Sequence, residues 1–151
     1  MDLLNEKEVY NMIQIKKLSS TAVVPSYAHA HDAGMDLYAC ESMVITAGER
    51  GLVPTGMAMA IPAGYVGLIW DKSGMALKFG LKVMGGVIDA GYRGEVKIVM
   101  HNLSSADYHV EKGMKVAQML IQPVMQMPLA EVSELDSTPR GEGGFGSTGL
   151  R

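Results

Sequence analysis

Hydrophobic residues between positions 13 and 130 form short runs or alternate with polar residues, and turn-forming residues interrupt them at close intervals. This pattern is typical of β-strands joined by tight turns, because successive side chains of a strand point to opposite faces of a sheet. No long segment has the 3.6-residue hydrophobic period of a helix. The pattern therefore predicts an all-β fold. The expected strands are residues 13–16, 43–45, 57–61, 65–70, 96–101 and 116–124.

One segment, residues 73–81, favours a helix instead. Its methionine, alanine, leucine and lysine at positions 75–78 have good helix propensity. Gly80 is suited to end the helix, because glycine readily adopts the left-handed backbone conformation found there. The fold is therefore expected to contain at most one short helix.

The chain of 151 residues has the length of a single domain. Residues 1–12 are largely polar and acidic, and we expect a disordered extension there. After Pro128, acidic residues lead into a glycine-rich tail. We therefore expect a single β domain over residues 13–130 and a flexible C-terminal arm over residues 131–151.

Composition and charge exclude several classes of protein. The net charge is −3 and only 19% of residues are charged, so nothing favours a nucleic-acid partner. No apolar run approaches the roughly 18 residues that span a bilayer, and the first residues do not resemble a signal peptide. The single Cys40 fits a reducing compartment, and we expect it to be a small buried hydrophobe. We therefore expect a cytoplasmic protein that binds neither nucleic acid nor membranes.

Two internal segments carry candidate chemistry. Residues 85–95 are expected to form a hairpin whose glycines let a ligand approach the backbone beside Asp89 and Tyr92. The alternative is a plain turn with a solvated acid. Residues 71–74 end an apolar run with a lysine, a serine and a glycine, a composition that suits phosphate oxygens but also occurs at ordinary strand ends.

The tail, residues 140–149, has glycines at the spacing of a P-loop but lacks the lysine and the following helix of that motif. Arg140 and Phe145 place a cation and an aromatic ring on one arm, which suits closure over an anionic ligand that bears a ring. From composition alone, the alternative is a disordered terminus. His29 and His31 are expected at the surface, because no nearby residue completes a metal site.

Five segments of the chain, in order, resemble the five motifs of the deoxyuridine triphosphatase (dUTPase) family. From first to fifth they are residues 33–39, 71–74, 86–95, 113–118 and 140–149. The resemblance covers essentially the whole chain after Met12. It implies a jelly-roll-like, distorted β-barrel subunit that assembles as a homotrimer, with three active sites that are each built from three chains.

The activity that this resemblance implies is that of a dUTP diphosphatase. Such an enzyme cleaves dUTP to dUMP and pyrophosphate by Mg²⁺-assisted in-line attack of water on the α-phosphorus. It thereby limits uracil in DNA and supplies dUMP for dTMP synthesis. The fifth segment would reach the active site of another subunit as a lid.

The resemblance also implies roles for residues around the nucleoside. Asp89 would orient and deprotonate the attacking water and touch the 3′-hydroxyl. Tyr92 would lie beneath the deoxyribose and exclude a 2′-hydroxyl by shape. Gly86, Val87 and Ile88 would pair with uracil through backbone groups, an arrangement that cytosine fails to satisfy.

Around the triphosphate, which carries about four negative charges, the resemblance implies cationic and polar groups. The phosphates would be bound by Lys72, Ser73, Gly74, Gln118 and Arg140. In the lid, Phe145 would stack on uracil, and Gly146 and Ser147 would also bind substrate. Asp36 would act on Mg²⁺ through bound waters, because this ion dehydrates reluctantly.

The chain departs from the family pattern at three places. Lys72 and Lys115 stand where arginine is usual, which keeps the charge but loses the bidentate fork of a guanidinium. Some relatives read uracil with an asparagine side chain, whereas this chain has Val83 and Met84 in that stretch. Uracil recognition is therefore expected to rest on backbone groups alone.

Two alternative functions remain from the sequence. The dCTP deaminases share the fold but carry a catalytic glutamate where this chain has Val99, which cannot activate water, so deamination is disfavoured. A non-catalytic trimer that only binds nucleotide is left open by Lys72 and Lys115. The presence of the expected site residues in the first four segments argues against this binding-only function. These residues are Asp36, Ser73, Asp89, Tyr92 and Gln118.

Overall fold

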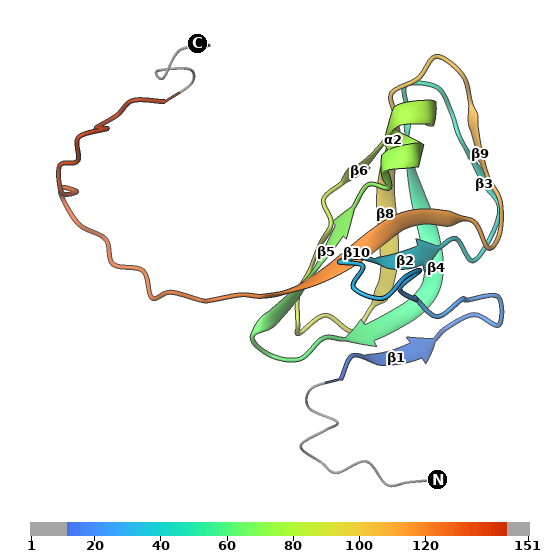
Figure 1. Ribbon diagram of the computed structural model, residues 1–151, viewed down its shortest axis with the longest axis horizontal. Helices are drawn as coiled ribbons and strands as arrows, with labels where there is room; N and C mark the ends of the chain where they lie inside the picture. The colour runs from blue at the N-terminus through green and yellow to red at the C-terminus, as the bar shows by residue number, and fades with distance from the viewer. Residues whose placement is uncertain (1–11, 145–151) are drawn as a thin grey trace, which may run out of the picture.

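The computed structural model describes residues 12–144, which form ten strands and one helix (Figure 1). The strands are β1 (Gln14–Lys17), β2 (Met35–Tyr38), β3 (Met43–Ile45), β4 (Arg50–Ala60), β5 (Tyr65–Trp70), β6 (Leu81–Met84), β7 (Val87–Ile88), β8 (Glu95–Asn102), β9 (Tyr108–Val110) and β10 (Lys115–Pro123). The helix is α2 (Ser73–Phe79). The expectations for residues 1–11 and for Phe145, Gly146 and Ser147 lie outside the described residues.

Eight of these strands form two four-stranded antiparallel sheets. One sheet has the order β1-β4-β8-β6 and the other β2-β10-β5-β7, while β3 and β9 form a separate pair. In Figure 1, β10 and β2 cross in front of β8 and β4. Because sequence neighbours mostly lie in different sheets, the chain passes repeatedly from one sheet to the other, as in a jelly roll. The all-β prediction is confirmed.

The two sheets enclose a single hydrophobic core. On β8, the buried residues Val96, Ile98 and Met100 alternate with more exposed ones, which is the period of a strand with one face turned inward. From the other sheet, Leu37 and Met119 are fully buried in the same cluster. Flexible methionine side chains fill much of this core. The buried methionines are Met35, Met57, Met59, Met100 and Met119.

Helix α2 connects β5 to β6 at one end of the molecule (Figure 1). Gly80 ends it with φ 65°, as the sequence predicted, and its N–H donates to the carbonyl of Ala76 at 3.1 Å. Phe79 packs on Tyr108 of β9 with ring centroids 5.1 Å apart, and the Tyr108 hydroxyl lies 3.6 Å from the sulfur of Met75. These contacts anchor a helix that has no buried residue of its own.

The predicted strands agree with the structure except in β4. The segments 43–45 and 65–70 match β3 and β5, and the predictions for β1, β8 and β10 are right to within one residue at each end. β4 begins at Arg50 rather than Met57, because a bulge between Pro54 and Ala58 lets the strand continue past Pro54 and Gly56. The expected start at residue 57 was wrong.

Beyond β10, residues 124–144 contain no helix or strand and run away from the two sheets (Figure 1). Three apolar side chains alternate along this segment: Met125 is 81% exposed, Met127 67% and Leu129 98%. An alternating apolar row without contacts is typical of a segment that packs on another surface. We call residues 124–144 the arm from here on; they include the described part, residues 131–144, of the C-terminal arm expected from the sequence.

The cysteine and two of the histidines lie as the sequence predicted. Cys40 is buried, as predicted, and burial raises the pKa of its thiol. His29 and His31 are exposed, as predicted. Among the described residues, no helix is long and apolar enough to cross a membrane.

Candidate active site

Three adjacent strands of the second sheet bring the first, second and fourth motif segments to one place. Asp36 of β2 stands opposite Gln118 of β10, and Gln118 stands opposite Trp70 of β5. Trp70 is the last residue of β5, so Asp71 and Lys72 follow immediately at this end of the sheet. Backbone pairing alone therefore gathers residues that are far apart in the sequence.

Asp36 is a buried carboxylate between two lysines. Its Oδ1 accepts a hydrogen bond from Lys72, while the Lys115 Nζ lies 2.7 Å from Oδ2 as an ion pair that is not aligned as a hydrogen bond. Burial alone would raise the pKa of Asp36, but the ammonium groups of Lys115 and Lys72 outweigh it and hold this pKa below its ordinary value of 3.8. Asp36 in turn raises the pKa of Lys115. At neutral pH the three groups together carry one net positive charge.

Gln118 is fixed from two sides. Its Nε2 donates to the carbonyl of Asp71 at 2.8 Å, and the Asp71 carboxylate accepts from the Val83 N–H at 2.5 Å and from Lys82 at 2.7 Å. On the other side, a Cβ added to Gly34 would lie 2.5 Å from the Gln118 Oε1. The glycine of the first segment therefore leaves the space that the Gln118 amide occupies.

A cavity of about 390 Å³ opens beside the lysine pair. Three lysines face it, and the first turn of α2 contains no acidic side chain. Such a lining is suited to phosphate oxygens. Besides Met75 and Phe79, the lining residues are Lys72, Ser73, Gly74, Lys78, Lys115 and Gln118. We call this the phosphate cavity.

The structure thus collects four of the predicted phosphate-binding residues, Lys72, Ser73, Gly74 and Gln118, in one cavity. The sequence interpretation missed Lys78. Its signal was available, because residues four apart on a helix lie on the same face, and Lys78 follows Gly74 by four positions.

The third segment does not form the expected hairpin, because β7 pairs with β5 and the next strand, β8, lies in the other sheet; its β7 part is the edge of the sheet that holds Asp36 and Gln118. Gly86 has φ 94°, and a Cβ there would lie 2.8 Å from the carbonyl oxygen of Ile69. The N–H of Ile69 donates to the carbonyl of Gly86 at 2.7 Å. β7 pairs with β5 through Val87 and Ile88 and has no other neighbour among the described strands. Backbone N–H and C=O groups on its outer edge are therefore available to a planar ligand.

Tyr92 is held by the turn that follows β7. Its N–H donates to the carbonyl of Asp89 at 3.0 Å, and its hydroxyl donates to the carbonyl of Glu95 at 3.0 Å. A Cβ on Gly94 would lie 2.6 Å from the Tyr92 Cζ, so only glycine leaves room for the ring. Arg93 closes the turn by donating to the carbonyl of Ala90 at 2.6 Å. These contacts therefore fix the position of the Tyr92 ring.

A second cavity, of about 500 Å³, lies over this turn and β7. Two carboxylates line it, and they differ in their contacts. Glu95 accepts from the Gly56 N–H at 2.9 Å and lies 3.3 Å from Lys97. Asp89 makes no side-chain hydrogen bond or ion pair with any described residue. The lining residues are Leu52, Val87, Ile88, Asp89, Tyr92, Glu95 and Lys97. We call this the nucleoside cavity.

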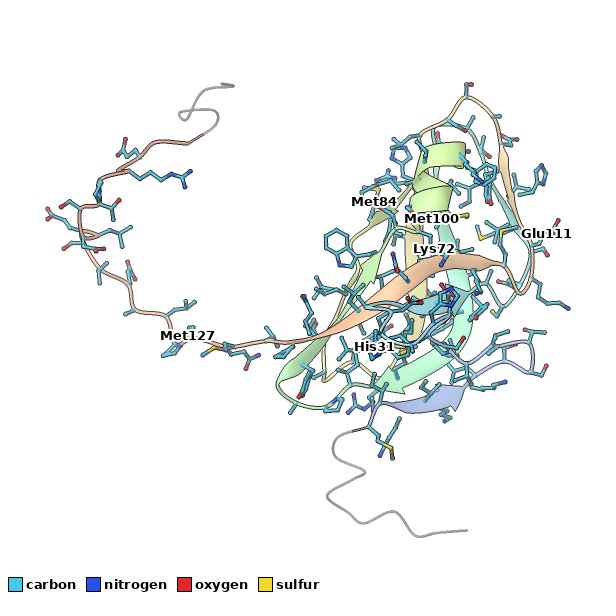
Figure 2. All side chains as sticks on the ribbon, in the orientation of Figure 1. His31, Lys72, Met84, Met100, Glu111 and Met127 are labelled. Carbon is cyan, nitrogen blue, oxygen red and sulfur yellow. The ribbon has the colours of Figure 1, made fainter. Side chains whose placement is uncertain are left out.

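Within one chain, these features lie in two distinct cavities. The nucleoside and phosphate cavities share no lining residue. Figure 2 shows Lys72 in the body beside β10, whereas Met127 lies far out on the arm. Arg140, also on the arm, donates from Nε to the carbonyl of Gly143 at 2.8 Å and contacts neither cavity.

The described residues lack a preformed metal site. They contain no group of three or more His, Cys, Asp or Glu side chains that could hold an ion. Asp36 is 3% exposed and faces two ammonium groups, so it has no open side for direct coordination. These residues fit an ion held mainly by substrate phosphates and water, which is a usual binding mode of Mg²⁺.

Val99 is the residue that the sequence interpretation sets against the catalytic glutamate of the dCTP deaminases. It lies on β8 between Leu52 of β4 and Met84 of β6, in an apolar row across the sheet. This position therefore offers no group that could activate water.

Comparison with known proteins identifies the family of this chain. A family model described as dUTPase matches residues 20–149. The deoxyuridine 5′-triphosphate nucleotidohydrolase of Clostridium acetobutylicum is 48% identical over 141 residues, which are 92% of this chain and 97% of that protein. The protein of the same name from Clostridioides difficile is 46% identical over 144 residues, covering 94% of this chain and 100% of the relative.

Solved structures of similar fold include two phage proteins. The dUTPase of Staphylococcus bacteriophage 80alpha, solved with dUPNHPP, has a TM-score of 0.88 and 34% identity, covering 93% of this chain and 99% of that one. A mutant dUTPase from phage phi11 of S. aureus, whose structure describes coordination of a structural Mg(II) ion, has a TM-score of 0.77 and 31% identity over 82% of this chain and 98% of that one. The chain belongs to the dUTPase family.

Proposed function

We propose that this protein cleaves dUTP to dUMP and pyrophosphate, with Asp89 as the general base. The observation that supports this most is the position of Asp89, a carboxylate without a structural partner among the described residues, between the β7 edge and Tyr92. Water attacks the α-phosphorus, the bond to the bridging oxygen of the β-phosphate breaks, and pyrophosphate leaves. Asp89 accepts the proton of the attacking water.

The proposed specificity follows from the nucleoside cavity. Uracil pairs with backbone groups of Gly86, Val87 and Ile88, whose outer edge has no strand beside it among the described residues. Fixed backbone donors and acceptors discriminate between uracil and cytosine, whose donor pattern is reversed. The ring of Tyr92 lies beneath the deoxyribose and leaves no room for a 2′-hydroxyl.

For the phosphates, the proposed ligands are Lys72, Ser73, Gly74 and Gln118, which share one cavity. Asp36 fixes the ammonium groups of Lys72 and Lys115 without neutralising both of them. Bound Mg²⁺ would neutralise phosphate charge, and Asp36 would reach its waters only after Lys72 or Lys115 moves away from the carboxylate. A lysine presents a point charge rather than a fork, so this site is expected to bind phosphate with less geometric selectivity than an arginine site.

The proposed assembly is a homotrimer with shared active sites. The separation of the two cavities within one chain supports it, since dUTP needs both kinds of contact at once. The exposed apolar row of the arm, Met125, Met127 and Leu129, is suited to pack on a neighbouring subunit. A closed symmetric trimer would place the same contacts at all three sites.

The proposed lid comprises residues 131–151, beyond the β domain of residues 13–130. Arg140 would add a guanidinium to the phosphates, while Phe145 would cover the uracil, with Gly146 and Ser147 beside them. Closure of such a lid excludes water from the reacting groups.

We also propose that the enzyme is cytoplasmic, where it would act on free nucleotides.

The proposal is tested by pyrophosphate release from dUTP with Mg²⁺. Three chains are compared: the intact protein, Asp89→Asn, and a chain that stops before Arg140. We expect Asp89→Asn to lower kcat by about 10²–10⁴-fold, the usual range for a general base. The shortened chain should also be slow, because it lacks the lid. Equal rates in all three would overturn the mechanism, and an inactive intact chain would favour a protein that only binds nucleotide.

A further inference from the structure

Lys78 lines the phosphate cavity although it lies outside all five motif segments. It is the basic residue of the last turn of α2, and its side chain is exposed. Gly74 precedes it by one helical turn on the same face. A Cβ added to Gly74 would meet no atom within 4 Å, so the space between the glycine and the lysine is open.

The three lysines of the cavity differ in what holds them. Lys72 and Lys115 both contact the buried carboxylate of Asp36, which offsets part of their charge. Lys78 has no ion-pair partner among the described residues. It is therefore the cation of this cavity whose charge is fully available to a ligand.

The helix holds Lys78 in this position. Phe79, the next residue, packs on Tyr108, and the Tyr108 hydroxyl contacts the sulfur of Met75. These contacts fix the rotation of α2 about its own axis, and with it the face that carries Gly74 and Lys78. The ammonium group is consequently presented to the cavity by a rigid backbone rather than by a loop.

We propose that Lys78 binds the pyrophosphate part of dUTP, the β- and γ-phosphates that leave in the reaction. This inference rests on the proposed function. The α-phosphate must lie near the water held by Asp89, which belongs to the nucleoside cavity. The phosphate cavity therefore receives chiefly the two terminal phosphates, and an additional cation there stabilises the charge that develops on the leaving group.

The experiment measures the binding of dUpNHpp and of dUMP, both with Mg²⁺, to the full-length protein and three variants. Lys78→Gln removes the charge, and Lys78→Arg keeps it. Lys17→Gln, on an exposed position of β1 in the other sheet, removes the same charge elsewhere and controls for the net charge of the protein. Circular dichroism verifies that each variant is folded.

We expect Lys78→Gln to weaken dUpNHpp binding about tenfold, as the loss of one charge-assisted hydrogen bond would. Binding of dUMP should change less than about twofold, and Lys78→Arg and Lys17→Gln should leave both ligands near wild-type affinity. Equal losses for dUMP and dUpNHpp, or no loss for either, would overturn the role of Lys78. An intact protein that binds dUpNHpp no better than dUMP would instead overturn the proposed function.

Discussion

Asp36 and Gln118 stand opposite each other on β2 and β10, and further contacts hold each of their side chains. Two lysines hold the carboxylate of Asp36, and the carbonyl of Asp71 holds the amide of Gln118. The polar groups of the proposed phosphate site are therefore positioned by backbone pairing and buried contacts before any ligand arrives. Preorganisation of this kind lowers the entropy that binding must overcome.

The first prediction concerns acid stability. Because the pKa of Asp36 is lowered in the fold, its ion pairs stabilise the protein above the ordinary pKa of 3.8, and this stability is lost as the pH falls through the lower folded value. Asp36→Asn should lower the free energy of unfolding at neutral pH by about 2 kcal/mol. This loss is smaller than that for a fully buried ion pair, because both lysines stay partly exposed to water.

Urea unfolding of wild type, Asp36→Asn and the exposed arm variant Asp136→Asn measures this effect. As the pH falls below 3.8, the gap in stability between wild type and Asp36→Asn should narrow, since the carboxylate of the folded protein protonates only below that value. Asp136→Asn should follow wild type throughout. A gap between wild type and Asp36→Asn that does not narrow with acid would show that the charge of Asp36 is not what stabilises the fold.

The second prediction uses the close contact between Gly34 and Gln118. A Cβ at Gly34 would overlap the Gln118 amide, so Gly34→Ala should displace this side chain while the sheet pairing is kept. We expect KM for dUTP to rise about tenfold, with dUMP binding nearly unchanged, because the displaced group binds phosphate. Steady-state kinetics and dUMP titration measure the two effects. An unchanged KM would remove Gln118 from the proposed phosphate ligands.

The third prediction compares alanine substitutions at two glycines of one turn. Gly94→Ala would place a methyl group against the ring of Tyr92, whereas Gly91→Ala meets nothing within 4 Å. If Tyr92 excludes ribonucleotides by shape, Gly94→Ala should lower the preference for dUTP over UTP, and Gly91→Ala should not. The ratio of kcat/KM for the two substrates reports this. Equal preferences in all three proteins would contradict the role of Tyr92.

The fourth prediction concerns the exposed apolar row of the arm. Leu129 and Met127 are 98% and 67% exposed, so replacing both with glutamine should not harm the fold of a single chain. If the arm packs on a partner subunit, the double variant should weaken the trimer and lower activity, because apolar contact area is lost. Light scattering across protein concentrations measures assembly. Val44→Thr, at an exposed position of β3, is the control, and identical behaviour of both variants would count against the docked arm.

The sequence predicted much of the fold because most strands alternate cleanly or are bounded by turns. It missed β2, β6 and β9, which have only three or four residues each, too few to show the period of a strand clearly. It also placed the start of β4 too late, because Pro54 and Gly56 usually interrupt strands and a bulge is not visible in a sequence.

For the site, the motif segments indicated which residues matter but not how they are held. The placement of Asp36 between Lys72 and Lys115, and of Gln118 against Gly34, depends on strand register, which only the fold defines. Lys78 lies outside the motifs and reaches the cavity through helix geometry. The sequence therefore predicted the chemical groups better than their arrangement.

The most direct measurement of the central claim is complementation between two inactive variants. Asp89→Asn disables the nucleoside cavity, and Lys72→Ala disables the phosphate cavity. Equal amounts of the two variants are unfolded together and refolded as a mixture. If each active site combines the two cavities from different chains, random assortment restores about one quarter of wild-type activity. If each chain contains its whole site, the mixture stays as inactive as the separate variants, and the account of a shared dUTPase site would be wrong.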